Sequence, residues 1–220
     1  NPTGKGFSRK ELEEIGRLCI QWDAMAITDE IYEHILYDQE THISMASIEG
    51  MAARTVTINS LSKTYSVTGW RVGWAIAGPD VTSRIRKVHD FLTVGAPTPF
   101  QKAGVCALDM PEKYYTALQE RYNDARIRIF TVLKNVGFNV EVPKGAYYIM
   151  ARTDALMDRY QERGADSFSL KLLDLTGIAT VPGTAFYHSP AMGRDQVRFC
   201  FAKNEKTIEA VCRRLERLIA

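Results

Sequence analysis

The sequence has little of what metal, disulfide or membrane chemistry requires. Its four cysteines form no CxxC pair, and its four histidines do not cluster at the spacing of metal ligands. We therefore expect no metal site and a reduced, cytoplasmic setting. Charged residues interrupt every apolar run well short of the ~18 residues that a membrane span needs. A soluble protein without a membrane partner is expected.

An excess of charge of one sign is also lacking. The 28 lysines and arginines nearly balance the 26 aspartates and glutamates, so the formal net charge is +2. No basic block or stripe offers the charge that binding to a nucleic acid requires. Hydrophobic residues make up 45% of the chain, enough for a real core. We expect a globular protein that acts on small molecules.

The first half of the chain alternates strands with helices. A capping box at Ser8 to Glu11 predicts a helix over residues 8–22. Strands are predicted just before Asp29, at residues 55–59 and at residues 72–77. This alternation favours an α/β fold with a mostly parallel sheet flanked by helices.

The residues that follow are predicted to be helical at first and, beyond a long helix, to form a smaller α/β unit. Helices are expected at residues 81–92, after Pro99, from Pro111 to Val136 and after Asn204, and strands at 139–142, 145–151, 178–181 and 196–202. We expect the domains to be residues 1–120 and 121–220. Because the chain opens directly on the turn-forming residues Asn1 to Gly4, a further N-terminal portion is also expected.

One run, Ser60 to Trp74, carries most of the chemical information. It sets Lys63 among hydroxyls, with Ser60 and Ser62 before it and Arg71 eight residues after it. This combination suits a phosphorylated carbonyl ligand, because the amine can form an imine while hydroxyls and a guanidinium bind phosphate oxygens. An isolated Ser-x-Ser-Lys is more often a polar surface loop. The length of the run, and its place directly after a predicted strand, favour a binding site.

The run resembles the lysine signature of the class I/II aminotransferases, a family of fold-type I enzymes that use pyridoxal 5′-phosphate (PLP). Further family motifs follow in the expected order: residues 1–4 match the NPTG turn, residues 29–32 the Asp-x-x-Tyr motif, and residues 197–201 the arginine-bearing strand. The resemblance covers essentially all of the chain and is to the C-terminal portion of the enzyme. Surrounding segments are similar to the kynurenine and glutamine transaminases and to bacterial aspartate and methionine transaminases.

The resemblance implies that Lys63 is the catalytic residue and holds PLP as a Schiff base. Ser60, Ser62 and Arg71 are implied to bind the phosphate of the cofactor. Asp29 is implied to be a buried carboxylate that keeps the pyridine nitrogen protonated, so that the ring can accept electrons. The structural alternatives are a surface lysine and a carboxylate that caps the end of a strand.

The resemblance further implies that Tyr32 and Asn1 contact the phenolic oxygen of PLP, and that Arg198 binds the α-carboxylate of the substrate. The alternatives are a packed tyrosine, a turn asparagine and an outward-pointing arginine. Alternation along the strand puts Arg198 and Cys200 on one face, so a solvent-facing Arg198 would require an exposed Cys200. That argument favours a buried arginine. Residues 145–148 and 182–187 resemble family loops near the substrate entrance.

The function implied is that of a PLP-dependent aminotransferase, which moves an amino group between an L-amino acid and a 2-oxo acid, in a cytoplasmic homodimer. Two alternatives stay open. A PLP-dependent lyase of the same fold, such as a carbon–sulfur β-lyase or an aminocyclopropane carboxylate synthase-like enzyme, would share the cofactor motifs. A non-catalytic PLP-binding domain of a transcription regulator is the other.

Overall fold

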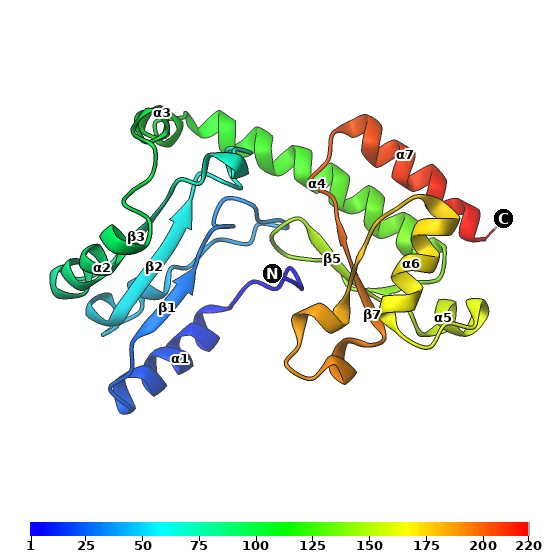
Figure 1. The fold of residues 1–220 in the computed structure, drawn as a ribbon, viewed down its shortest axis with the longest axis horizontal. Coiled ribbons are helices and arrows are strands. Elements are labelled where there is room, and N and C mark those ends of the chain that lie inside the picture. The colour runs from blue at the N-terminus through cyan, green and yellow to red at the C-terminus, as the bar shows by residue number, and fades with distance from the viewer. Residues whose placement is uncertain (220) are drawn as a thin grey trace. The chain divides into compact units, whose positions relative to one another are not determined.

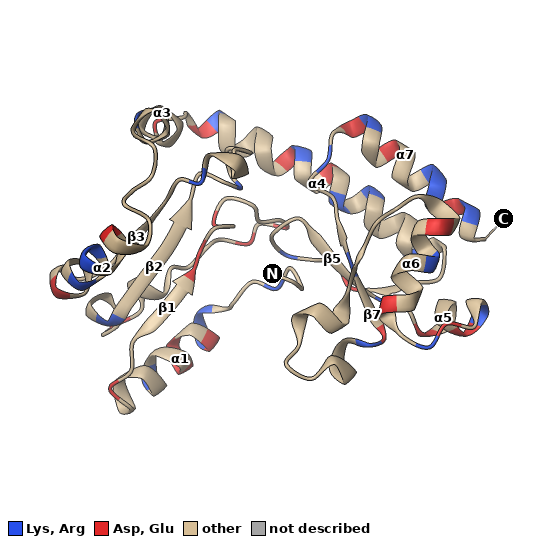
Figure 2. Ribbon diagram, in the orientation of Figure 1, with Lys and Arg blue, Asp and Glu red and all other residues tan. Residues whose placement is uncertain are grey.

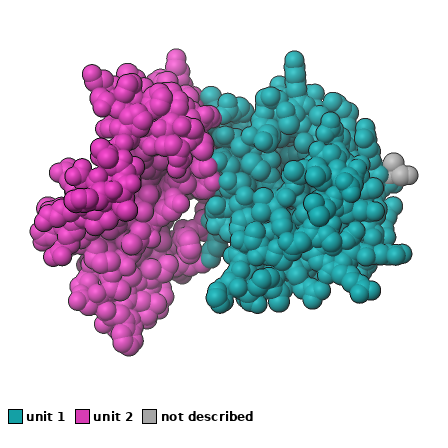
Figure 3. Space-filling view, viewed as in Figure 1, with its two compact units in different colours: residues 1–5, 117–220 teal, residues 6–116 magenta. Residues whose placement is uncertain are grey.

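The computed structural model describes residues 1–219 and divides them into two compact units (Figures 1 and 3). Residues 6–116 form the N-terminal unit. Residues 117–219, together with Asn1–Lys5, form the C-terminal unit. The boundary between residues 116 and 117 lies within helix α4, Glu112–Asn135. The assignment of residues 1–120 and 121–220 to a large and a small domain remains a prediction.

The N-terminal unit is built on a three-stranded sheet of order β1-β2-β3 (Figure 1). Strand β1, Ala26–Asp29, pairs parallel with β2, Thr55–Ser60, and β2 pairs antiparallel with β3, Gly73–Ile76. The expected parallel arrangement therefore describes the first pair and not the second. The α/β class is confirmed.

Helix α1, Arg9–Gln21, begins as the sequence predicts. The Ser8 hydroxyl accepts from the Glu11 amide, and the Glu11 carboxylate accepts from the Ser8 amide at 2.9 Å, which completes the capping box. Its buried face, at Leu12 and Gly16, packs on the segment after β1. A Cβ at Gly16 would lie 3.2 Å from side-chain atoms of Ile48 and Met51, so a small residue lets the helix approach closely.

The other helices of this unit include two that the sequence predicts, at residues 81–92 and after Pro99, and three short 3-10 helices that it does not. They are the 3-10 helices η1 (Met45–Ser47), η2 (Ala52–Arg54) and η3 (Thr68–Trp70), and the α-helices α2 (Pro79–Leu92) and α3 (Thr98–Leu108). Both α-helices carry proline in their first turn, where a missing N–H costs no hydrogen bond.

The C-terminal unit contains a four-stranded sheet of order β4-β5-β7-β6, in which neighbouring strands pair antiparallel. The strands are β4 (Asn139–Val140), β5 (Tyr148–Arg152), β6 (Val181–Pro182) and β7 (Gln196–Cys200). All four are shorter than predicted. Proline at the end of β6 cannot donate to a ladder, which limits that strand to the edge of the sheet.

Helices precede, separate and follow these strands along the chain, and they contribute residues to the core of this unit. They are α4, α5 (Asp154–Tyr160), α6 (Ala165–Thr176) and α7 (Glu205–Leu215), with the 3-10 helices η4 (Gly183–Phe186), η5 (Pro190–Gly193) and η6 (Glu216–Leu218). Helices α5 and α6 were not predicted from the sequence. Phe138 contacts the rings of Phe168 and Phe199 edge-on, and all three are at most 3% exposed, so α6 packs on the sheet.

Acidic and basic residues alternate along α4 and α7, as Figure 2 shows. Within residues 1–219, no helix combines the length and the apolar character that crossing a membrane demands.

Candidate active site

The predicted site residues of the N-terminal unit gather at one edge of its sheet. Because β1 and β2 are parallel, with Asp29 opposite Ile58, their carboxyl ends meet at the same edge. Asp29 ends β1, and Ser60 ends β2 and opens the segment that carries Lys63. We call residues 60–71 the lysine loop.

Hydrogen bonds hold the lysine loop in a defined course. The Leu61 amide donates to the Val72 carbonyl at 3.1 Å, and the Ser62 amide donates to the Ser60 hydroxyl at 3.1 Å. The Ser62 carbonyl accepts from the Thr68 hydroxyl at 3.0 Å. Ser62 is buried and Lys63 is half-buried. The loop therefore presents its lysine from a fixed backbone.

Arg71 ends the lysine loop in a backbone conformation that few residues other than glycine adopt. Its φ is +54°, in the left-handed region, which costs a residue with a Cβ about 1–2 kcal/mol. One Nη atom donates to the Thr68 carbonyl at 3.0 Å, and the side chain is exposed. Such strain persists where the surroundings fix it, and it is frequent at binding sites.

Asp29 corrects one expectation. Its side chain is exposed in this chain, whereas the neighbouring Glu30 is only 7% exposed. Asp29 accepts from the Ile31 amide at 3.2 Å, the capping contact that the sequence analysis weighed as its alternative. The buried carboxylate at this strand end is therefore that of Glu30, because alternation along β1 turns neighbouring side chains to opposite faces.

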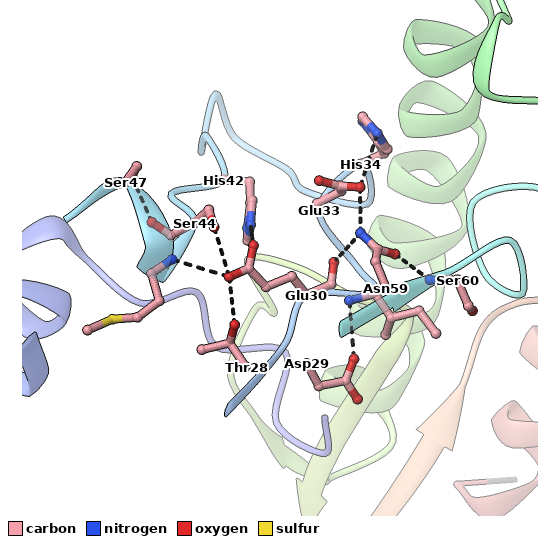
Figure 4. A network of polar contacts seen from close by, with 12 residues as sticks. Thr28, Asp29, Glu30, Glu33, His34, His42, Ser44, Ser47, Asn59 and Ser60 are labelled. Carbon is pink, nitrogen blue, oxygen red and sulfur yellow. Dashed lines mark hydrogen bonds and ion pairs between the residues drawn. The ribbon is translucent and has the colours of Figure 1, made fainter. Parts of the chain in front are cut away.

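Glu30 lies at the centre of a polar network that the sequence analysis missed (Figure 4). Its carboxylate contacts His42 Nε2 at 2.7 Å and accepts from the hydroxyls of Thr28 and Ser44 at 2.9 and 3.1 Å. The Met45 amide donates to it at 3.2 Å. Burial raises the pKa of Glu30, but the hydrogen bonds from His42 and the two hydroxyls outweigh it, and the pKa lies below its usual value.

Asn59 links the two strand ends and was also missed. Its amide nitrogen donates to the Glu30 carbonyl at 3.3 Å and to the Glu33 carboxylate at 2.5 Å, and its oxygen accepts from the Ser60 amide at 2.7 Å. Tyr32 lies half-buried in the turn between Glu30 and Glu33. An asparagine inside a run of β-branched residues was the available signal, since asparagine is a poor strand former.

In the C-terminal unit, the structure brings Asn1 and Arg198 into contact. Arg198 Nη1 donates to Asn1 Oδ1 at 2.6 Å, across 197 residues of sequence. The guanidinium lies over the rings of Tyr148 and Phe186, with its carbon 4.0 and 4.5 Å from their centroids. These four residues are called the arginine cluster below.

Arg198 was expected to be buried because Cys200, on the same face, was expected to be buried. That premise is wrong. Cys200, on the same face of β7, is exposed, so alternation places Arg198 on the less buried side. The two rings nevertheless cover part of the side chain. Its Nε is buried and has no hydrogen-bond partner among the described residues. A buried donor of a charged group is costly to leave unpaired, and a carboxylate would satisfy it.

The donor sets fit the groups that the resemblance implies. In the lysine loop, Lys63 offers an amine, Ser60 and Ser62 offer hydroxyls, and Arg71 offers a guanidinium, all on a backbone held by hydrogen bonds; an aldehyde with a phosphate ester requires this chemistry. The arginine cluster offers a planar fork suited to a carboxylate. Among residues 1–219, no group of three or more His, Cys, Asp or Glu residues could hold a metal ion.

Known proteins are similar to this chain in both fold and sequence. The structure of N-succinyldiaminopimelate aminotransferase from Mycobacterium tuberculosis superposes with a TM-score of 0.92 at 32% identity, covering 99% of this chain and 56% of that one. An aromatic aminotransferase from Pyrococcus horikoshii OT3 gives 0.88 at 34% identity, covering 100% of this chain and 57% of that one. The fold is therefore that of the aminotransferases.

The sequence comparison places the chain more narrowly. The family described as aminotransferase class I and II matches residues 1–215. Human kynurenine–oxoglutarate transaminase 1 is 32% identical over 237 residues, covering 99% of this chain and 55% of the relative. The chain belongs to the class I and II aminotransferase family, which confirms the predicted resemblance. It spans about half the length of the curated relatives that it matches.

Proposed function

We propose that the protein is a PLP-dependent aminotransferase that moves an amino group between an L-amino acid and a 2-oxo acid. Membership of the family supports this reaction. The observation that carries the proposal is Arg198, a guanidinium covered by two rings whose buried Nε has no acceptor among the described residues. An α-carboxylate is the group that amino acids and 2-oxo acids share, and it would supply that acceptor.

Lys63 is the residue proposed to hold PLP covalently. Ser60, Ser62 and Arg71 would bind its phosphate, since their hydroxyls and guanidinium can donate to several oxygens at once. PLP, when bound, supplies an electron sink that stabilises negative charge at the substrate Cα. Lys63 would take the proton from that Cα as a general base and deliver it, as a general acid, to the C4′ carbon of the cofactor.

The remaining residues orient these groups. Asp29 would pair with the pyridine nitrogen, and Tyr32 and Asn1 would donate to the phenolic oxygen. Arg198 would hold the α-carboxylate, while Asn1 fixes one edge of its guanidinium. The rings of Tyr148 and Phe186 limit rotation of that plane. We further propose that the enzyme works as a cytoplasmic homodimer without nucleic-acid or membrane partners.

Amino transfer is tested with the full-length protein supplied with PLP, a panel of L-amino acids and one 2-oxo acid acceptor at a time. The proposal predicts that the new amino acid and the new 2-oxo acid accumulate in equal amounts, and only when both substrates are present. Release of many equivalents of a 2-oxo acid per enzyme without any acceptor would instead establish the lyase reaction. Binding of PLP with no product of either kind would establish the regulator domain.

A further inference from the structure

Arg126 is a buried charge for which the proposed reaction has no direct use. It lies on α4 and is only 2% exposed. Its Nε donates to Asn123 Oδ1 at 3.1 Å and its Nη1 donates to the Pro143 carbonyl at 2.8 Å. A buried arginine pays a large desolvation cost, which an apolar residue of similar size would avoid, so its contact with Pro143 calls for a reason.

The segment that Arg126 holds is the one that holds the N-terminal turn. The amides of Lys144 and Gly145 both donate to the Gly4 carbonyl at 2.9 Å. Gly4 has a φ of +74°, and a Cβ there would lie 2.4 Å from the Pro143 Cβ, so the two backbones are in direct contact. Residues 143–145 therefore lie between the Arg126 guanidinium and the turn.

Asn1 is the first residue of that turn, and its side chain accepts a hydrogen bond from Arg198. A second route leaves the same segment in the other direction. Ala146 is 3% exposed and has a φ of +58°, a strained conformation for a residue with a Cβ, and it leads directly to Tyr148. The Tyr148 ring covers the Arg198 guanidinium. Two of the contacts that orient Arg198 thus depend on where residues 143–146 lie.

We propose that Arg126 is a positioning residue for substrate binding: by holding Pro143, it fixes the Gly4 turn and Tyr148, and through them the guanidinium of Arg198. The inference rests on the proposed function for its kinetic consequence. Its structural link, from Arg126 to the Gly4 turn, does not depend on turnover. The two can therefore fail separately.

The test compares full-length Arg126→Met, which keeps length and loses the donors, with Arg126→Lys, which keeps a charge and can still donate to Pro143. Arg128→Met is the matched control, because Arg128 lies on the same helix and pairs with Asp124 and Glu209 at its surface. In Arg126→Met we expect the KM of both the amino donor and the oxo acid to rise about tenfold, the effect of one misplaced hydrogen bond to a charged group, with kcat within about twofold. Arg126→Lys should recover most of the loss, and Arg128→Met should show none.

A merely structural Arg126 would behave differently in a double-mutant cycle with Asn1→Ala. If Arg126 acts through the turn, its substitution should raise KM much less when Asn1 is already alanine. Additive effects on KM would overturn the proposal. Should Arg126→Met fail to fold, the same cycle is run with Arg126→Gln, which also removes the guanidinium, and additivity there would count equally against the proposal.

Amide hydrogen exchange supplies the readout that needs no activity. Lys144 and Gly145 should exchange faster in Arg126→Met than in Arg128→Met, because their acceptor at Gly4 is no longer held. Equal exchange in the two variants would overturn the inference whether or not the enzyme transaminates. Faster exchange in a protein that transfers no amino group would support the structural link and reject only the proposed function.

Discussion

The lysine loop and the arginine cluster are assembled by different means. The lysine loop is a continuous run whose backbone bonds join residues close in sequence, such as Leu61 with Val72 and Ser62 with Thr68. The arginine cluster joins Asn1 to Arg198 across 197 residues, and its rings come from β5 and η4. The first is local and the second depends on the whole C-terminal unit.

This difference separates what each region is expected to control. A loop fixed by its own strand ends can position a reactive amine. Loss of that amine should lower kcat. A cluster fixed by distant segments can orient a charge for binding, and its loss should act on KM. The comparison is testable because each region has one central residue, Lys63 and Arg198.

Replacing Lys63 should have the largest effect. Lys63→Ala removes the amine that moves the Cα proton, so we expect kcat to fall by roughly three orders of magnitude, the contribution of a general acid–base group. Steady-state kinetics of the full-length enzyme measure this loss. Lys102→Ala, at an exposed position on α3, is the control and should keep full activity. A Lys63→Ala enzyme with an unchanged kcat would show that the lysine loop does not control the chemical step.

Arg198→Lys should show the opposite pattern. Lysine keeps the charge but not the planar fork, and so we expect KM for both substrates to rise about 100-fold while kcat changes far less. The exposed Arg213→Lys on α7 serves as the control. If Arg198→Lys lowered kcat and left KM unchanged, the arginine cluster would not be the binding element.

Glu30→Gln tests whether the lysine loop depends on the buried network beside it. Glutamine replaces one carboxylate oxygen with an NH2 group, which cannot accept the hydrogen bonds that the hydroxyls and the backbone amide donate. We therefore expect a loss of about 1–3 kcal/mol in the free energy of unfolding at pH 7. Because folding lowers the pKa of Glu30, this stabilisation is present above the ordinary carboxyl pKa of about 4.3 and is lost as pH falls through the lower folded value.

Denaturant unfolding of Glu30→Gln and of the exposed Glu13→Gln, followed from pH 7 to pH 3, measures that difference. The Glu13 variant should match the unsubstituted protein throughout. A deficit in Glu30→Gln that stayed constant down to pH 3 would show that the carboxylate charge does not stabilise this strand end.

Phe186→Leu should have the smallest effect and sharpens the account of the arginine cluster. The substitution removes one of two rings from the guanidinium, a contact of about 0.5–1 kcal/mol, so KM should rise about threefold. Phe130→Leu, on α4 of the same unit, controls for the loss of an aromatic ring. Equal KM values in the two variants would mean that the ring does not orient Arg198.

Much of the fold was predictable because its signals are local. The capping box at Ser8, the β-branched run at residues 55–59 and the apolar stripe after Asn204 each fix an element through neighbouring residues. The antiparallel pairing of β3 was not predictable, because strand direction depends on the course of the lysine loop that precedes it. Helices α5 and α6 were not assigned from the sequence.

The site divides along the same line. Lys63 with its serines and Arg71 stood out as one run. The contact between Asn1 and Arg198 was not expected, because it joins residues 197 positions apart in the sequence. The roles of Glu30 and Asn59 were not predicted, since which of two adjacent carboxylates is buried depends on how β1 packs. The exposed Cys200 shows the same limit: alternation gave the shared face correctly but not its burial.

Lys63 is proposed to be the residue to which the cofactor attaches, and peptide mapping locates that attachment. The full-length protein is incubated with PLP, reduced with borohydride, digested and analysed by mass spectrometry, with Lys63→Ala treated in parallel. The account predicts one pyridoxyl-modified peptide that contains Lys63, and none in the variant. Modification at another lysine, retained in Lys63→Ala, would contradict it.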